Sequence, residues 1–595
     1  MATYIRLTDY KSSDEKEQGF FKPENRYVAK QEDFEKIPGS PIAYWVSDRV
    51  KEIFEENKLG DYGEPKGGMS TSDNERFLRY WNEINLKSLA LNIQNLEDAK
   101  KSCKKWFPYN KGGEFRKWYG NMDYIVNYYN DGEEVKQWVI QNPNDPKTTH
   151  WSRRLFNAEY YFNESVSWTL ISSSNFGARY FPRGFIFDSN GLSLFIDKKK
   201  ELFFLSFLSS KISKYFLKII SSTIAFLSGD IKRLPIIFPK QESIKQTIDS
   251  LTQQCIDISK EEWDSRETSW DFTCNELLKH KTDSKIENAF NAYCSYWREK
   301  FYQLHSNEEE LNRLFIDIYE LQDELTSDVD LKDITILKKE ADIVDGKLVF
   351  NADEIMKQFI SYAVGVMFGR YSLDHEGLHV ANMDESLEDA DAKFNIQNPT
   401  FQADDDNIIP VLSGEYFTDD IVSLFVEFVK TTFGQEYLQE NMRFIESSLG
   451  MDIRKYFVKG FYEDHIKRYK KRPIYWMVSS PKKGFMALLY MHRYSDDIFA
   501  RVQNSYLREY IAKLEAAILD YQRIADDATN STSLRTKAAK EVESMTKAKE
   551  ECIAFDRQNL STFAQTRTPI DLDDGVKVNY CKFGDILYPI SGLCK

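Results

Sequence analysis

The positively charged side chains of this sequence could bind a polyanion, and they are unevenly distributed along the chain. Residues 101–240 carry 21 Lys and Arg against 12 Asp and Glu, a net charge of +9, whereas the whole chain of 595 residues has −15. Residues 241–595 carry −20. Because phosphate neutralisation draws proteins to DNA, this pattern is typical of a chain in which one segment meets a polyanion. The alternative is that its lysines are only solvated faces of a turn and a helix, namely Lys198, Lys199, Lys200, Lys211, Lys214 and Lys218.

A polar loop precedes the basic segment. Residues 61–74 contain Gly63, Gly67 and Gly68, and five consecutive polar residues follow at 70–74. Glycine gives the backbone freedom, and short polar side chains supply hydrogen bonds close to the main chain. The pattern predicts a loop whose side chains reach outward.

No metal site is predicted from the cysteine and histidine spacing. The seven cysteines form no C-x-x-C pair, so we expect reduced, mostly buried thiols. His375 and His379 are four residues apart, but Gly377 and the acidic neighbours favour a loop over a shared helical face.

Several catalytic motifs are absent from the sequence. An adenine methyltransferase orients its flipped base with an Asn-Pro-Pro-aromatic loop, but none of the sixteen prolines here is adjacent to another. The sequence contains neither a phosphate-binding G-x-x-x-x-G-K-[ST] loop nor a G-x-S-x-G elbow. Acidic residues are abundant, but no carboxylate cluster lies on a convincing strand. We therefore expect no catalytic residue in this chain.

The spacing of hydrophobic residues predicts the helices and strands that hold these groups. Strands are predicted at 124–129 and 178–187. A turn is predicted at Asp345-Gly346, and Ser306 with Glu309 resembles a capping box at the start of a helix. Further helices are predicted at 201–220, as one amphipathic helix, and at 352–368, and an antiparallel helical hairpin is predicted from 507 to 555.

These elements predict an α+β fold in which a mixed β domain is followed by largely α-helical domains that end in the helical hairpin. We place the divisions at 1–40, 41–240, 241–335, 336–500 and 501–595. No apolar run approaches the ~20 residues that cross a bilayer, and the first ten residues are too polar for a signal peptide. We therefore expect a cytoplasmic protein without a membrane segment.

Long strings of the sequence resemble PglX, the adenine-specific DNA methyltransferase family of bacterial BREX phage-defence systems, in the region after its catalytic domain. Residues 4–10 resemble the closing strand of the family's methyltransferase domain. Residues 229–236 also resemble the end of target-recognition domains in single-chain restriction-modification enzymes. The resemblance is carried further by residues 36–45, 68–79, 105–113, 115–121, 171–175, 179–188, 472–476 and 479–485.

The resemblance implies that residues 41–240 form a target-recognition domain for duplex DNA and that residues 1–40 are a remnant of the methyltransferase domain with a linker. S-adenosylmethionine would then bind in a catalytic domain outside this chain, supplied in cis or in trans. Phosphate contacts are expected from Lys111, Arg116, Lys117, Arg153, Arg154, Arg179 and Arg183, and contacts to base edges from Ser70, Thr71, Asn74, Ser172, Ser173, Ser174 and Asn175.

For any one of these residues a structural salt bridge or a satisfied turn is an equal alternative. The aromatic set Trp106, Phe107, Tyr109, Trp118 and Tyr119 is expected to pack in a core rather than stack on bases, because stacking suits single-stranded or flipped nucleotides. Two other functions stay open. One is a scaffold that docks other BREX proteins through the acidic portion and the hairpin, and the other is an autonomous nuclease.

Overall fold

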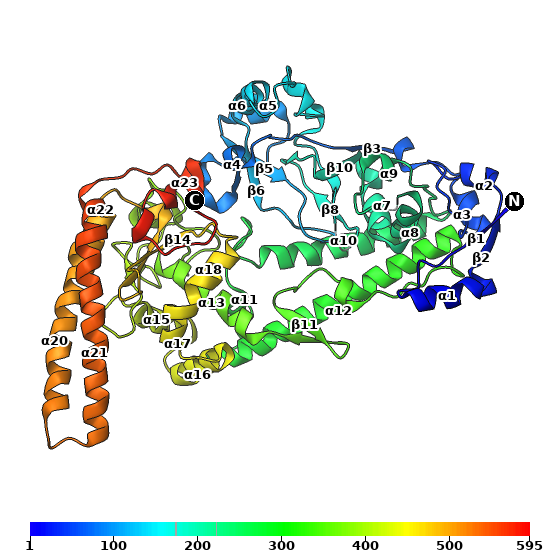
Figure 1. Cartoon of the computed structure of the whole chain (residues 1–595). Helices are drawn as coiled ribbons and strands as arrows, with labels where there is room; N and C mark the ends of the chain where they lie inside the picture. Colours follow the sequence, from blue (N-terminus) through cyan, green and yellow to red (C-terminus); the bar gives the residue numbers. More distant parts are fainter. Residues whose placement is uncertain (173–174, 222, 595) are drawn as a thin grey trace. The chain divides into compact units, whose positions relative to one another are not determined.

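A computed structural model describes residues 1–172, 175–221 and 223–594, which divide into two compact units (Figure 1). Unit 1 comprises Met1–Leu78, Ala90–Trp263 and Arg298–Lys338. Unit 2 comprises Arg79–Leu89, Asp264–Trp297 and Lys339–Lys595, of which Lys595 lies outside the described residues. Each unit is therefore built from segments distant in sequence.

Unit 1 holds three small sheets. One is an antiparallel pair, β1-β2, the second has the order β3-β10-β7-β8, and the third has the order β4-β6-β5-β9 with β5 and β9 parallel. Of β4, only Leu78 belongs to unit 1. Their bounds are β1 Ala2–Ile5, β2 Arg26–Ala29, β3 Gly63–Lys66, β4 Leu78–Tyr80, β5 Trp106–Asn110, β6 Tyr124–Asn127, β7 Ser165–Thr169, β8 Ala178–Phe181, β9 Ile186–Phe187 and β10 Gly191–Ile196. The strand prediction for 124–129 is confirmed, and the predicted strand at 178–187 is two strands, β8 and β9, separated by a turn.

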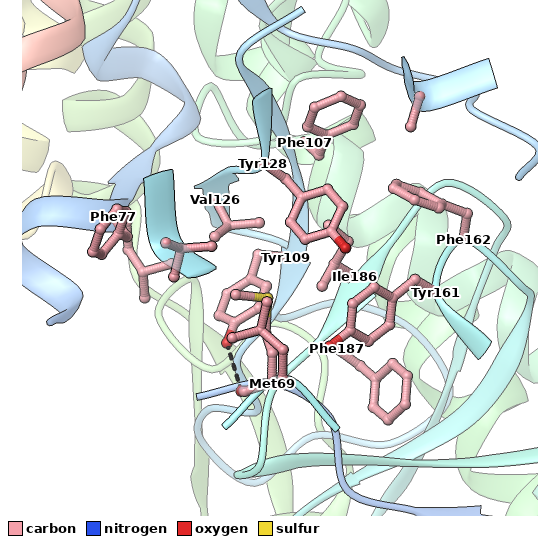
Figure 2. Packing of buried hydrophobic residues seen from close by; sticks show 14 of the residues in the cluster. Met69, Phe77, Phe107, Tyr109, Val126, Tyr128, Tyr161, Phe162, Ile186 and Phe187 are labelled. Atoms are coloured by element: carbon pink, nitrogen blue, oxygen red, sulfur yellow. Dashed lines mark hydrogen bonds between the residues drawn. The ribbon is translucent and has the colours of Figure 1, made fainter. Parts of the chain in front are cut away.

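Aromatic side chains form the core beneath the third sheet (Figure 2). Phe107 and Tyr109 of β5 are fully buried, and the Tyr109 hydroxyl donates to the Met69 carbonyl at 3.1 Å. Tyr128 and Phe162 pack on the same cluster. The five aromatic residues Trp106, Phe107, Tyr109, Trp118 and Tyr119 are all at most 4% exposed, so the expectation of core packing is confirmed.

Helices pack against the second of these sheets. The predicted helix at 201–220 is two helices, because the chain breaks at Ser210, whose side chain accepts from the Ser213 amide and caps the second helix. Unit 1 contains α1 Ser13–Phe21, α2 Glu32–Glu35, α3 Asp48–Ile53, α4 Asn74–Phe77, α5 Leu96–Ser102, α6 Tyr129–Gln141, α7 Lys198–Ser209, α8 Lys211–Ile220, α9 Ser228–Lys232 and α10 Glu242–Asp264.

The long helix α12, Ile286–Tyr319, contributes residues to both units. Ser306 and Glu309 lie in its interior, so the predicted capping box was wrong. Glu309 instead accepts from the backbone amide of Val329 at 3.0 Å. The local spacing matched a cap. However, apolar residues keep their helical spacing on both sides of Ser306, so the helix continues through this position.

Unit 2 is mainly helical, with a hairpin β11-β12 and a sheet of order β13-β15-β14. The predicted turn at Asp345-Gly346 joins β11 to β12, and both residues have a positive φ. The strands are β11 Ala341–Val344, β12 Lys347–Phe350, β13 Ile409–Pro410, β14 Tyr475–Ser479 and β15 Met486–Tyr490. The helices are α11 Glu276–Lys279, α13 Ala352–Met367, α14 Leu387–Phe394, α15 Ile421–Phe433, α16 Leu438–Leu449, α17 Ile453–Tyr456, α18 Tyr462–Arg468, α19 Ile498–Arg501, α20 Arg508–Asp526, α21 Thr532–Phe555, α22 Ser561–Gln565 and α23 Gly575–Cys581.

The predicted helical hairpin is confirmed as α20 and α21, which run side by side (Figure 1). The expectation of reduced cysteines was wrong for two of them, because Cys581 and Cys594 form a disulfide. Of the free cysteines, Cys255, Cys294 and Cys552 are buried and Cys103 is exposed. Spacing within the sequence gave no sign of this pairing, since the two residues meet only through the fold of the carboxy-terminal tail. Together the two units confirm the α+β class.

Candidate nucleic-acid interface

Two loops of unit 1 lie against each other and bring several predicted DNA-binding residues together. We call residues 67–76 and 142–156 the loop pair. The backbone amide of Ser70 donates to the Arg154 carbonyl at 2.7 Å. Next to this bond, Asn157 Nδ2 donates to the Gly67 carbonyl at 2.8 Å. These bonds hold the start of the first loop against the end of the second.

The first loop is anchored by its own buried residues. Gly68 packs on β9 so closely that a Cβ atom would lie 1.8 Å from the Phe187 carbonyl oxygen, so only glycine fits. Thr71 is buried, and its hydroxyl donates to Asn74 Oδ1 at 2.8 Å. Asn74 itself is exposed. The loop therefore presents the Asn74 amide outward from a rigid base, whereas Thr71 supports it from within.

The second loop is organised around one carboxylate. Asp145 accepts from the Thr148 hydroxyl at 2.7 Å and from Arg154 Nε at 3.1 Å. The hydrogen bond from Arg154, followed by that from Thr148, holds the pKa of Asp145 below its usual value. The charge of Arg154 is therefore largely matched within the loop.

Two other cations of this loop have no such partner. Arg153 is exposed, and its guanidinium donates only to the Lys147 carbonyl at 3.5 Å. Lys147 is also exposed, and no carboxylate among the described residues pairs with either side chain. The loop thus presents two exposed positive charges without a salt bridge among the described residues, and that of Arg153 also helps to lower the pKa of Asp145. Sequence reasoning missed Lys147, although its place after Asn142-Pro143-Asn144-Asp145-Pro146 marks a turn that projects the residues following it.

The structure places three other predicted contacts in the interior. Arg116 is 6% exposed and donates to the Tyr119 carbonyl at 2.6 Å and to the Glu262 carboxylate of α10. The second oxygen of Glu262 accepts from the Leu337 amide at 2.9 Å. Arg116 therefore ties the segment after β5 to α10 and to the end of unit 1.

Lys117 makes a parallel connection to α12. Its ammonium group pairs with Glu308, whose other oxygen accepts from the Trp118 indole at 2.7 Å. Lys117 and Glu308 are both buried. We call the pairs Arg116–Glu262 and Lys117–Glu308 the interior ion pairs.

Arg179 lies beside these pairs and is 1% exposed. It donates to the Arg116 carbonyl at 3.3 Å and to the Thr169 hydroxyl at 3.2 Å. Burial, together with the nearby charge of Arg116, lowers the pKa of Arg179 to about 9. No face of these three cations is available to a phosphate in this fold.

The remaining predicted residues are scattered over unit 1. Lys111 is half-buried and its ammonium lies 3.5 Å from the Asp188 carboxylate. Asn175 donates to Asp333 at 3.2 Å, and the Ser172 hydroxyl donates to the Asn175 carbonyl at 2.9 Å. Arg183 is exposed in the turn between β8 and β9 and donates to the Gln94 carbonyl at 3.4 Å. Ser173 and Ser174 lie outside the described residues.

Other kinds of site were searched across the described part of the chain. No group of three or more His, Cys, Asp or Glu side chains there is arranged to hold a metal ion. The same residues include no helix with the length and apolar content needed to traverse a bilayer. His375 and His379 lie in a loop, as predicted, and His379 Nε2 is 3.2 Å from Asp391.

Comparison with known proteins identifies relatives of this chain by sequence similarity. No protein-family profile matches it. It is 38% identical over 606 aligned positions to the adenine-specific methyltransferase PglX of Lacticaseibacillus casei (strain Zhang), covering 98% of this chain and 48% of that protein. It is 35% identical over 587 positions to the adenine-specific methyltransferase BrxX of Escherichia coli O9:H4 (strain HS), covering 95% of this chain and 46% of that protein. The chain thus spans about half the length of these relatives, and over that span it is a PglX-like protein.

Proposed function

We propose that this chain recognises duplex DNA for a PglX-like, adenine-specific (N6) methyltransferase of a BREX-type phage-defence system, and that the loop pair makes the contact. The observation that supports the site is that Lys147 and Arg153 are exposed and without a salt bridge among the described residues, on a loop that a backbone hydrogen bond joins to the loop of Ser70 and Asn74. The names of the relatives support adenine methylation as the activity that this recognition serves.

The two kinds of group have different tasks in this proposal. Lys147 and Arg153 hold phosphates and set the orientation of the duplex, because contacts to phosphate position a protein without reading sequence. Asn74 is suited to read an adenine edge, since its amide matches the donor and acceptor of that base in the major groove. Thr71, Asp145 and Arg154 keep both loops in place.

The catalytic step belongs to a domain that this chain does not supply in our proposal. Its residues include no adjacent prolines for a base-orienting loop, and nothing in the described residues is assigned to S-adenosylmethionine. We propose that a methyltransferase domain acts with it in cis or in trans, binds that cofactor, and works in the cytoplasm.

Duplex binding measured by fluorescence anisotropy at several salt concentrations tests the proposal. We expect affinity to fall steeply with salt, and the Lys147→Ala/Arg153→Ala variant to lower the slope of log K against log salt by about 1.8, because each phosphate contact contributes ~0.9. The matched control is Lys16→Ala/Arg26→Ala, which removes two exposed cations elsewhere in unit 1. Salt-independent binding, or an equal loss in the control, would refute the proposed site.

A second candidate function, docking of other defence proteins, is favoured by the hairpin α20–α21. It exposes Leu519 and Leu534, which are 56% and 45% exposed. Co-purification of BREX proteins with the wild-type chain, but not with Leu519→Ser/Leu534→Ser, would support docking. Equal recovery with both chains would exclude this surface.

A further inference from the structure

Phe156, the last residue of the loop pair, carries an exposed aromatic ring to which the proposed function assigns no role. Its side chain is 42% exposed. It stacks on no aromatic ring and on no cation of the described residues. A phenyl ring forms no ordinary hydrogen bond with water, so its exposure leaves apolar surface whose burial would be favourable. The ring is therefore available to a partner that offers an apolar or aromatic surface.

The backbone that carries this ring is held in place on both sides. Leu155, directly before Phe156, is 2% exposed and belongs to the aromatic core. The Phe156 carbonyl accepts from the hydroxyl of Tyr161, another residue of that core (Figure 2), at 3.0 Å. Directly after Phe156, Asn157 has a φ of 53° and is tied to the first loop through its side chain. The fold therefore fixes the chain at Phe156 while leaving its ring outside the core.

Phe156 is close in the chain to a cation that we propose for phosphate contact. It follows Arg153 by three residues, and three residues span at most about 11 Å between their Cα atoms. Successive base pairs of B-DNA are about 3.4 Å apart along the axis, so this distance covers about three base-pair steps. A duplex whose phosphate contacts Arg153 therefore has base steps within reach of Phe156.

The proposed reaction gives such a ring a task. An enzyme that modifies a base of a duplex must take that base out of the stack, and this leaves a gap between the neighbouring base pairs. Some DNA-binding proteins insert apolar side chains, phenylalanine among them, between base steps. Insertion costs the energy of unstacking but removes the apolar ring from water. A phenylalanine on a fixed backbone beside an exposed arginine has the properties of such a wedge.

We propose that Phe156 inserts between base pairs of the bound duplex and stacks on the bases there. The loop pair then opens the stack in addition to holding phosphates and reading base edges. This role of Phe156 rests on the proposed function, because it requires that the duplex lie on the loop pair. A duplex from which one base is already missing costs less to open, so such a duplex is the preferred ligand.

Fluorescence anisotropy with an intact duplex, and with the same duplex carrying one abasic site, tests the proposal. We expect the wild-type chain to bind the abasic duplex at least about fivefold more tightly, since stacking of one ring on a base contributes roughly that factor or more. Phe156→Ala should lose this preference, whereas Phe156→Tyr should keep it, because either ring can stack. The control Phe21→Ala removes a ring that is 70% exposed elsewhere in unit 1 and should keep the preference.

The salt dependence of binding separates an inserted ring from one that only supports the loop. The slope of log K against log salt reports phosphate contacts, so Phe156→Ala should keep the wild-type slope while its affinity for the abasic duplex falls. A smaller slope in Phe156→Ala would assign the ring a structural role and overturn its insertion. Equal affinity of the wild type for both duplexes, or a preference that survives in Phe156→Ala, would overturn insertion but not DNA binding. Absence of duplex binding by the wild type would overturn both.

Discussion

The interior ion pairs and the loop pair both contain lysine and arginine from the same basic segment of unit 1. They differ in whether these cations pair with carboxylates. Arg116 and Lys117 meet carboxylates inside the fold, whereas Lys147 and Arg153 meet none and face outward. A net charge of +9 over residues 101–240 therefore overstates the charge offered to a partner. The interior pairs connect distant segments of unit 1, and the loop pair is the surface that we propose for DNA.

The difference also predicts how each region responds to substitution. A buried ion pair that loses one partner leaves an uncompensated charge away from water, which costs far more than the pair contributes when intact. Exposed cations cost the fold almost nothing when removed, because water already solvates them. The following substitutions test that contrast, from the largest expected effect to the smallest.

Removing Glu262 is expected to have the largest effect on stability. Glu262→Ala strands the Arg116 guanidinium in the interior and should lower the free energy of unfolding by about 3–5 kcal/mol. Urea unfolding followed by tryptophan fluorescence measures this. The control Glu159→Ala removes an exposed carboxylate and should change it by less than about 0.5 kcal/mol. Similar midpoints for the two variants would mean that the interior pair does not hold unit 1 together.

Replacing both Arg116 and Glu262 tests whether the unpaired charge causes the loss of stability. Arg116→Met/Glu262→Leu removes the charges together, so we expect it to be more stable than Glu262→Ala by about 1–4 kcal/mol. The same urea titration compares them. A double variant as unstable as the single one would show that the hydrogen bonds of Arg116 to backbone carbonyls, rather than its unpaired charge, dominate.

Charge reversal in the loop pair is expected to spare the fold and weaken DNA binding. Lys147→Glu/Arg153→Glu turns two attractions to phosphate into repulsions, so duplex affinity should fall by more than about 100-fold at low salt, while the urea midpoint stays that of the wild type. Anisotropy and urea unfolding on the same sample check both. A shifted midpoint would show that Lys147 and Arg153 also contribute to stability, which contradicts the difference proposed between the two regions.

Releasing Arg154 from Asp145 should produce the smallest effect, a strengthening of duplex binding by a few-fold at low salt in Asp145→Asn. Because Arg154 holds the pKa of Asp145 below its usual value, the carboxylate keeps its charge from pH 5 to pH 8. Asp145 should therefore add no pH dependence over that interval, and the gain should come only from the substitution. Weaker binding by the variant would show that Asp145 orients Arg154 for the contact.

The sequence predicted those parts of the fold that depend on the local spacing of apolar residues. The hairpin α20–α21, the helix α13 and the strand β6 were all found from regular spacing of apolar residues. The break at Ser210 and the continuation of α12 through Ser306 were missed, because a serine is equally compatible with a cap and with a helix interior until its tertiary neighbours are known.

The candidate site was predicted only by residue type. Arg116 and Arg153 are indistinguishable in a charge count, and only the position of Glu262, 146 residues away from Arg116, separates their roles. Ser70 and Arg154 were predicted independently, but their meeting through a backbone hydrogen bond depends on the packing of β9 against Gly68. Long-range pairing of this kind leaves no local pattern.

Lysine acetylation footprinting, with and without duplex DNA, tests the account most directly, because it measures both regions in one sample. We predict that DNA protects Lys147, that Lys117 is unreactive in both states, and that Lys16 is reactive in both. Protection of Lys16 with Lys147 left reactive, or a reactive Lys117 that becomes protected when DNA binds, would contradict the assignment of DNA recognition to the loop pair.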